Sequence, residues 1–186
     1  MNIEEIIDSI HPISDLSKKK LIEHIEEVNM NKACILLKAG RQESNIYFIK
    51  KGVVRGYFDH ENGEITFWFG EEGETILSMR SYVENKISYE NIELLENCEL
   101  YKIRTDKLQK LYEEDVHIAN WGRKLAEKEL LKVESRLISR EFLSAKQRYD
   151  ELIKNQPSLI QRIPLKYIAS YLGITPVSLS RIRKEK

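Results

Sequence analysis

The amino-acid sequence predicts an α+β protein with three parts in order: a β-roll, a long helix and a C-terminal helix-turn-helix. Short apolar runs separated by turn residues fill residues 33–104, which is typical of a small roll or barrel of strands. An apolar repeat of alternating three- and four-residue steps follows to residue 137, and a glycine-centred helix pair ends the chain. We expect the three parts to span residues 1–104, 105–138 and 139–186.

The composition is that of an ordinary globular protein, with 32% charged and 41% hydrophobic residues among 186. No apolar run approaches the ~20 residues that a bilayer span needs, and the acidic N-terminus lacks the features of a secretory leader. We therefore expect a cytoplasmic protein with no membrane association. Cys34 and Cys98 stand far apart, which favours reduced thiols and is too few ligands for an iron–sulfur cluster.

Two short helices are expected before the roll, at residues 3–10 and 17–30. Apolar residues recur at helical spacing in the second of them, and Ser14 or Ser17 can cap it. We assign these helices to the same domain as the roll.

Inside the roll, Asn62-Gly63 between two strand-like runs is the strongest hairpin signal in the sequence. Phe67, Trp68 and Phe69 are consecutive, so strand alternation should place Trp68 on one face and its two neighbours on the other. Core packing is the simplest role for these rings, and an apolar ligand pocket is the functional alternative.

The segment from Thr105 to about Leu137 is expected to be one long helix, capped by Thr105 or Asp106, with a further helix from Ser139 to about Lys154. Its heptad-like repeat, interrupted by Arg123, predicts a seam that packs on a second copy of the chain. The alternative is a core helix of a monomer. The residues expected at the dimer interface are Ala119, Ala126, Leu130, Val133 and Leu137.

The last 22 residues have the spacing of a helix-turn-helix. Gly173 suits the reversal after the first helix, while Thr175 and Pro176 suit the start of the second. Leu179 and Ile182 return the apolar face of the second helix to the first. An ordinary helical hairpin in a core is the alternative, but that would not need a polar and basic outer face.

The charge distribution agrees with a DNA-contacting end. Residues 139–186 hold 10 Lys and Arg against 4 Asp and Glu, whereas residues 1–138 hold 20 against 26. A solvated basic surface would give the same balance, so the helix pair is the stronger signal. The residues expected to contact double-stranded DNA are Lys166, Thr175, Val177, Ser178, Ser180, Arg181 and Lys184.

The order of these parts resembles the cyclic-AMP-receptor and fumarate-nitrate-regulator (Crp/Fnr) superfamily of transcription regulators. The likeness rests on Gly40, Ile46–Gly56, Asn62-Gly63-Glu64, Glu72-Gly73-Glu74 and Ile163–Arg183. The stretch Leu172–Lys184 looks like the short members from Bacteroidetes-type bacteria. The resemblance implies a cyclic-nucleotide-binding-like roll and a homodimer whose recognition helices enter successive major grooves, with RNA polymerase as a further candidate partner.

On the sensor side, the resemblance implies a ligand site at Gly73, Glu74, Ser88 and Arg80. Relatives that bind cyclic nucleotide hold the phosphate with a Gly-Glu pair and a later Arg-Ser pair. Gly73-Glu74 matches the first pair and Ser88 the end of the second, but Ile87 stands where the arginine would be. Without a bidentate guanidinium in register, we expect no cyclic AMP binding of the usual kind. The expectation is no definite cofactor and an unidentified small-molecule effector.

On the DNA side, Arg181 is the one base reader that the resemblance keeps, since Val177 cannot accept a hydrogen bond from cytosine. The chain also ends at Lys186, before a full wing. These departures motivate the alternative function, a cyclic-nucleotide or other small-ligand module with degenerate DNA binding.

An enzyme is the weakest interpretation. A metalloenzyme on the roll would need clustered histidines and carboxylates, but the four histidines are scattered along the chain. We therefore predict no catalytic residues and no metal site. We expect instead that a signal on the roll shifts its packing on the 106–137 segment and resets the spacing of the recognition helices.

Overall fold

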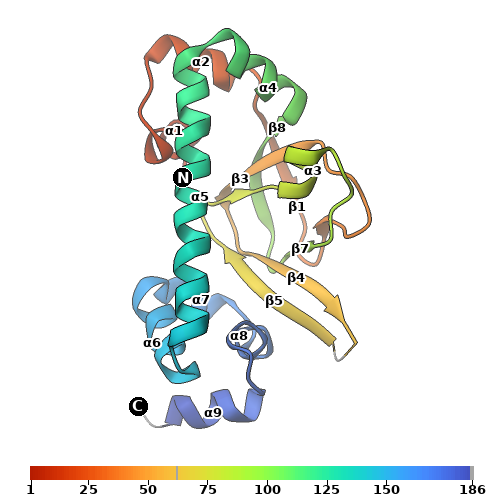
Figure 1. Ribbon diagram of the computed structural model, residues 1–186, viewed down its shortest axis with the longest axis vertical. Helices are drawn as coiled ribbons and strands as arrows, with labels where there is room; N and C mark the ends of the chain where they lie inside the picture. The colour runs from red at the N-terminus through yellow and green to blue at the C-terminus, as the bar shows by residue number, and fades with distance from the viewer. Residues whose placement is uncertain (62, 185–186) are drawn as a thin grey trace.

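The computed structural model describes residues 1–61 and 63–184, so Asn62 of the expected hairpin turn and residues 185–186 lie outside it. One long helix runs along the side of a β-roll. Short helices cover the upper end of the roll, and a second group of helices lies at its lower end (Figure 1). The predicted α+β class and the order of its parts are confirmed.

The strands of the described residues form two four-stranded antiparallel sheets that face each other as a roll. Their orders are β1-β8-β3-β6 and β2-β7-β4-β5. The strands are β1 (Glu26–Met30), β2 (Ile35–Leu37), β3 (Asn45–Lys51), β4 (Val54–His60), β5 (Gly63–Gly70), β6 (Thr75–Ile76), β7 (Asn91–Leu94) and β8 (Cys98–Arg104).

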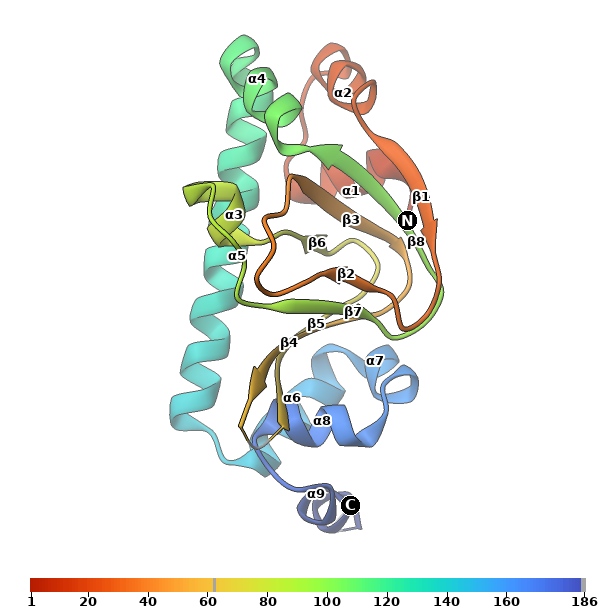
Figure 2. The same cartoon turned by 90° about the vertical axis from the view of Figure 1, so that its right-hand side faces the viewer.

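The helices lie outside the roll. Figure 2 shows α1, α2 and α4 at one end of the roll and α6 to α9 at the other. Among the described residues, no helix is both long enough and apolar enough to serve as a membrane span. The helices are α1 (Ile3–Ile10), α2 (Asp15–Ile22), α3 (Met79–Glu84), α4 (Thr105–Glu114), α5 (Val116–Phe142), α6 (Ala145–Asn155), α7 (Pro157–Arg162), α8 (Leu165–Leu172) and α9 (Pro176–Lys184).

The expected helix over 17–30 is wrong in its second half. α2 ends at Ile22, and residues 26–30 form β1, which pairs with β8. Glu26 lies opposite Lys102, and their side chains form an ion pair of 2.8 Å. Pairing with a strand far away in the sequence outweighs a local helical pattern that is weak on its own.

The expected single helix over 105–137 is divided at Asp115. This residue has an extended backbone with φ −141°, and its carboxylate accepts hydrogen bonds from the N–H groups of His117 (2.9 Å) and Ile118 (3.3 Å). An aspartate that satisfies two free N–H groups is a strong N-cap, so it starts α5 as a new helix.

The far end of the long helix also differs from the expectation. α5 continues through Ser139 to Phe142, and the next helix starts only after Ser144. Ser144 and Gln147 form a reciprocal capping box, which fixes this start. The sequence contains this box, but the expected start at Ser139 overlooked it.

The core that holds α5 on the roll is centred on Trp121, which is fully buried. Its ring meets Phe48 of β3 edge-on at 6.0 Å between centroids, and its Nε1 donates a hydrogen bond of 3.0 Å to the carbonyl of Ile7 in α1. The first half of α5 is therefore fixed on both the sheet and the N-terminal helix.

A β-bulge changes the expected arrangement of the aromatic run in β5. The register of β4 and β5 shifts between Gly56 and Tyr57, which leaves Phe67 as the extra residue. Phe67 lies over Gly56, on the side of the strand that carries Trp68, and Trp68 packs against the roll core. Phe69 is buried against the C-terminal helices instead. The bulge thus breaks the alternation that would have separated Phe67 from Trp68.

Candidate functional site

The helix pair α8–α9 is built by local signals. Gly173 ends α8 in the left-handed conformation (φ +67°), which a residue with a Cβ adopts only with strain. The Thr175 hydroxyl accepts a hydrogen bond of 3.1 Å from the Ser178 N–H and so caps α9. Leu179 is fully buried against Ile168 and Ala169. The pair is a compact helix-turn-helix.

The outer face of α9 is polar, basic and open to solvent. Val177, Ser180, Arg181 and Lys184 are exposed, as is Lys166 at the start of α8. Ser178 is half-buried, and its hydroxyl lies 3.0 Å from that of Thr175, so these two predicted DNA contacts also serve the cap. Arg183 is exposed on the same helix and was not among the predicted residues.

An ion-pair cluster attaches the helical unit α6–α9 to the roll. The Arg162 guanidinium at the end of α7 donates two hydrogen bonds to the Glu72 carboxylate, at 2.8 and 2.9 Å, and also pairs with Glu96. Glu72 additionally accepts the N–H of Gly52 at 2.8 Å. The Arg162 hydrogen bonds lower the pKa of the Glu72 carboxyl to about 2. The contact is therefore charged over the physiological pH range.

A second contact joins α8 to the β4–β5 hairpin. The Ser170 hydroxyl accepts the N–H of Thr66 and donates to the carbonyl of Glu64, both at 2.9 Å. Arg55 of β4 is almost fully buried, and its guanidinium lies 3.7 Å from the ring centroid of Tyr167 in α8. It also pairs with Glu64 at 2.5 Å and Glu93 at 3.0 Å. The hairpin and the helix-turn-helix are therefore joined by the hydrogen bonds of Ser170 to the hairpin backbone and by the contact of Arg55 with the Tyr167 ring, while the ion pairs of Arg55 lie within the roll.

The Glu72–Arg162 pair predicts a defined loss of stability in acid. Because the pKa of folded Glu72 lies near 2 and its ordinary value is 4.5, the pair stabilises the fold above pH 4.5 and ceases to do so as the pH falls towards 2. Glu72→Gln should therefore cost about 1–2 kcal/mol near neutral pH, after allowance for partial exposure, and little near pH 2. Urea unfolding across this range measures the difference, with Glu113→Gln at an exposed position of α4 as the control. A difference that does not change with pH would contradict the assignment.

The second half of α5 exposes its apolar side chains. Leu130, Val133 and Leu137 of the expected seam are all at least half exposed, while Ala119 is half-buried and Ala126 is exposed. Arg123, which interrupts the repeat, pairs with Glu127 one turn on. The seam is therefore available on the surface and is not used in the core of this chain.

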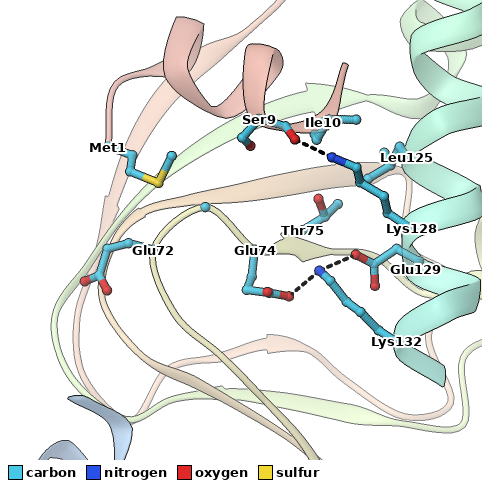
Figure 3. A pocket seen from close by; sticks show the side chains of 11 residues that line it. Met1, Ser9, Ile10, Glu72, Glu74, Thr75, Leu125, Lys128, Glu129 and Lys132 are labelled. Atoms are coloured by element: carbon cyan, nitrogen blue, oxygen red, sulfur yellow. Dashed lines mark hydrogen bonds and ion pairs between the residues drawn. The ribbon is translucent and has the colours of Figure 1, made fainter. Parts of the chain in front are cut away.

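A hollow of about 330 Å³ lies between α1, the turn before β6 and α5 (Figure 3). Glu74 from the turn and Glu129 from α5 both pair with Lys132 at 2.8 Å, and Lys128 donates to the carbonyl of Ser9. Partial burial alone would lower the pKa of Lys132, but its bonds to Glu129 and Glu74 raise it above the ordinary value. The hollow is small, and its charges are largely paired with one another.

The predicted ligand residues do not all line this hollow. Gly73 and Glu74 line it, whereas Arg80 and Ser88 do not. Arg80 lies on α3, with Glu84 as its ion-pair partner at 3.9 Å. Ser88 is buried, and its hydroxyl donates to the carbonyl of Lys38 at 3.0 Å. Its hydroxyl is thus engaged by the backbone of the chain itself.

Comparisons with known proteins agree with this architecture. Residues 27–115 match the family model of the cyclic nucleotide-binding domain. FixK2 of Bradyrhizobium japonicum superposes with a TM-score of 0.76 at 18% identity, covering 87% of this chain and 83% of that chain. A protein assigned to the Crp/Fnr family of transcriptional regulators from Eubacterium rectale gives 0.73 at 17% identity, covering 95% and 87%. The chain therefore shares the fold of these proteins.

A further solved structure has a similar fold. The c-di-GMP-responsive global regulator CLP of Xanthomonas campestris gives a TM-score of 0.68 at 15% identity, covering 92% of this chain and 91% of that chain. No curated protein sequence matches the chain significantly. The family match runs from β1 to the cap of α5, so the likeness of α6–α9 to Crp/Fnr-type regulators rests on the solved structures.

Sequence reasoning overlooked the residues that join the roll to the helical unit α6–α9. Arg162, Glu72 and Glu96 lie far apart in the sequence, and none belongs to a motif that announces an ion pair. Tyr167 and Arg55 likewise meet only in the folded chain. The one available signal was the opposite net charge of residues 1–138 and 139–186, which does not identify the two members of any ion pair.

Proposed function

We propose that the chain is a DNA-binding transcription regulator that acts as a homodimer, and that its roll does not bind cyclic AMP in the usual way. The observation that carries the proposal is the exposed face of α9, on a helix fixed by the Thr175 cap and the buried Leu179. A helix presented in this way fits the major groove. Arg181 is its candidate guanine reader, and Val177 is suited to contact with a thymine methyl group.

Dimerisation is the second part of the proposal. One recognition helix with few phosphate contacts would bind DNA weakly, whereas two linked copies bind with an increased effective concentration. The exposed seam of α5 gives the surface for such a pair. α5 also leads directly into the helical unit α6–α9, which carries the recognition helix α9. The two recognition helices would then meet a two-fold-symmetric site.

The hydroxyl groups near α3 support the statement about cyclic AMP. Ser78 is the N-cap of α3, Ser81 donates to the carbonyl of Lys86, and Ser88 donates to that of Lys38. Donors already used by the chain are poorly placed to hold a phosphate, and Arg80 is engaged with Glu84. These contacts therefore favour an effector of another chemical class.

The test is selection of binding sites from a random DNA pool at two salt concentrations. We expect enrichment of a two-fold-symmetric site whose affinity falls with salt. Arg181→Ala should lower affinity for that site about 10- to 100-fold and relax the preference at one base position in each half-site. Lys166→Ala is the matched control, because loss of a phosphate contact should weaken binding to all sequences alike.

No enrichment at low salt, with the dimer intact, would contradict DNA recognition. That outcome would favour the second candidate function, a small-ligand module with degenerate DNA binding. One departure motivates this candidate: Val177 stands in place of a hydrogen-bonding base reader.

A further inference from the structure

One arginine of α6 bonds to the ends of two other helices. The Arg148 guanidinium donates a hydrogen bond of 2.7 Å to the carbonyl of Leu143, where α5 ends, and one of 2.6 Å to the carbonyl of Leu172, the last residue of α8. A longer contact of 3.5 Å reaches the carbonyl of Arg140 in the last turn of α5. The last carbonyls of a helix have no partner within it, so one guanidinium satisfies two helix ends and opposes their partial negative charge.

The position of Arg148 follows from the start of α6. The capping box of Ser144 and Gln147 begins this helix directly after α5, so its fourth residue lies within reach of the end of α5. Hydrogen bonds from a charged donor are stronger than neutral ones, and the planar fork of an arginine can bond two acceptors at once. A lysine has a single ammonium group and no fork, so it could not hold both carbonyls in the same geometry.

The end of α8 that Arg148 holds is the end nearest the recognition helix. Only Gly173, Ile174 and Thr175 separate α8 from α9. This connection is tightly bonded, because the Ile174 N–H donates to the carbonyl of Ala169 at 3.0 Å and Thr175 caps α9. A short, bonded connection transmits the position of the end of α8 to α9 with little freedom.

The other contacts of α8 join it to the roll. Ser170 and Tyr167 contact the β4–β5 hairpin, and the ring of Tyr171 lies 5.3 Å from that of Phe69 on β5. Arg148 instead relates the end of α8 to the end of α5. Figure 1 shows α6, α8 and α9 grouped at the lower end of α5, where this link is made.

We propose that Arg148 is a positioning residue that sets the separation of the two recognition helices in the homodimer, and hence the spacing of the half-sites that the dimer accepts. The proposal rests on the proposed function, because it takes α5 as the dimerisation helix and α9 as the recognition helix. The paired α5 helices would define the two-fold axis, and Arg148 fixes each α8–α9 pair to the end of its own α5. Moving a half-site by one base pair shifts it by ~3.4 Å and rotates it by ~35°. A firmly held recognition helix therefore discriminates against such a change.

The test measures the spacing preference as well as the affinity. The two-fold-symmetric site selected from the random pool is rebuilt with spacers one and two base pairs shorter and longer, and binding to each is measured. For the unmodified chain we expect a loss of at least about 10-fold for one base pair. Arg148→Lys should lower affinity for the best spacer about 3- to 10-fold and reduce the discrimination to about 3-fold or less.

Two further variants make the result specific. Arg140→Lys is the matched control, because it makes the same change at an exposed position in the last turn of α5, and it should leave the spacing preference unchanged. Arg148→Gln keeps an amide donor but loses the charge, and it should broaden the preference as Arg148→Lys does. Circular dichroism and sedimentation velocity show that each variant is folded and dimeric. The base preference within each half-site should stay the same, since Arg181 is not altered.

The outcomes separate this proposal from the proposed function. If no two-fold-symmetric site is enriched, DNA recognition itself is overturned, and the spacing role with it. If the site is bound but folded, dimeric Arg148→Lys and Arg148→Gln keep the original spacing preference, the positioning role is overturned and DNA recognition stands. A loss of affinity that is equal for all spacers would also overturn it, because that is the result of a purely structural role.

Discussion

Replacing Leu130 and Leu137 by glutamate should convert the protein to monomers and lower its affinity for a two-fold-symmetric DNA site at least about 100-fold. Both side chains are more than half exposed, so the change costs the folded monomer little. In a dimer, each glutamate would face its counterpart across an apolar seam, where two unpaired charges are strongly unfavourable. The loss of DNA affinity follows because two half-sites would no longer be bound by one linked particle.

The measurement is sedimentation velocity together with DNA binding for the same preparations. Glutamate at Leu16, an exposed apolar residue on α2, is the control for added charge and should change neither result. Circular dichroism shows whether the double variant remains folded. A folded variant that still dimerises would mean that the seam is not the interface, whatever its effect on DNA binding.

Trp121→Ala should destabilise the fold by about 3–5 kcal/mol, the largest effect we expect from a single substitution. The indole is fully buried between α1 and the sheet, and its removal leaves a cavity. It also removes one of the two hydrogen bonds that the Ile7 carbonyl accepts, the other coming from the His11 N–H at 3.0 Å. Trp121→Phe keeps most of the ring volume and loses the 3.0 Å hydrogen bond, so a smaller cost of about 1–2 kcal/mol is expected.

Urea unfolding followed by far-ultraviolet circular dichroism gives both values. Equal costs for the alanine and phenylalanine variants would mean that the hydrogen bond, and not ring packing, holds α5 on the roll. The functional consequence of Trp121→Ala should be a loss of dimer affinity, because α5 must be firmly supported to present its seam. Dimers of unchanged affinity in the alanine variant would show that this support is unnecessary.

The turn before β6 (residues 71–74) connects the roll with α5 and with the helical unit α6–α9. Glu71 accepts a hydrogen bond from Ser158 at 2.5 Å, Glu72 holds Arg162, and Glu74 holds Lys132 of α5. A displacement of this turn would therefore reach both the long helix and the helical unit α6–α9. The predicted signal path, in which the roll shifts its packing on α5, stays a prediction, and this turn is its most direct physical route.

Features set by near neighbours in the chain were predictable from the sequence. The reversal at Gly173, the cap at Thr175 and the apolar return of Leu179 depend on backbone conformation and helical spacing within a few residues. The apolar repeat of α5 follows from local spacing, whereas its exposure was decided by the fold, because the same spacing also fits a core helix. The roles of the predicted DNA and ligand residues stay predictions, since they concern partners outside the chain.

Features set by partners far along the chain were decided only by the tertiary structure. Residues 26–30 became a strand because β8 was available to pair with them, and Phe67 joined the Trp68 face because a bulge met Gly56. Arg162 attached the helical unit α6–α9 to the roll because Glu72 and Glu96 converged on it. Local signals are encoded within one helical turn, whereas pairing and ionic contacts depend on which distant segments the whole fold brings together.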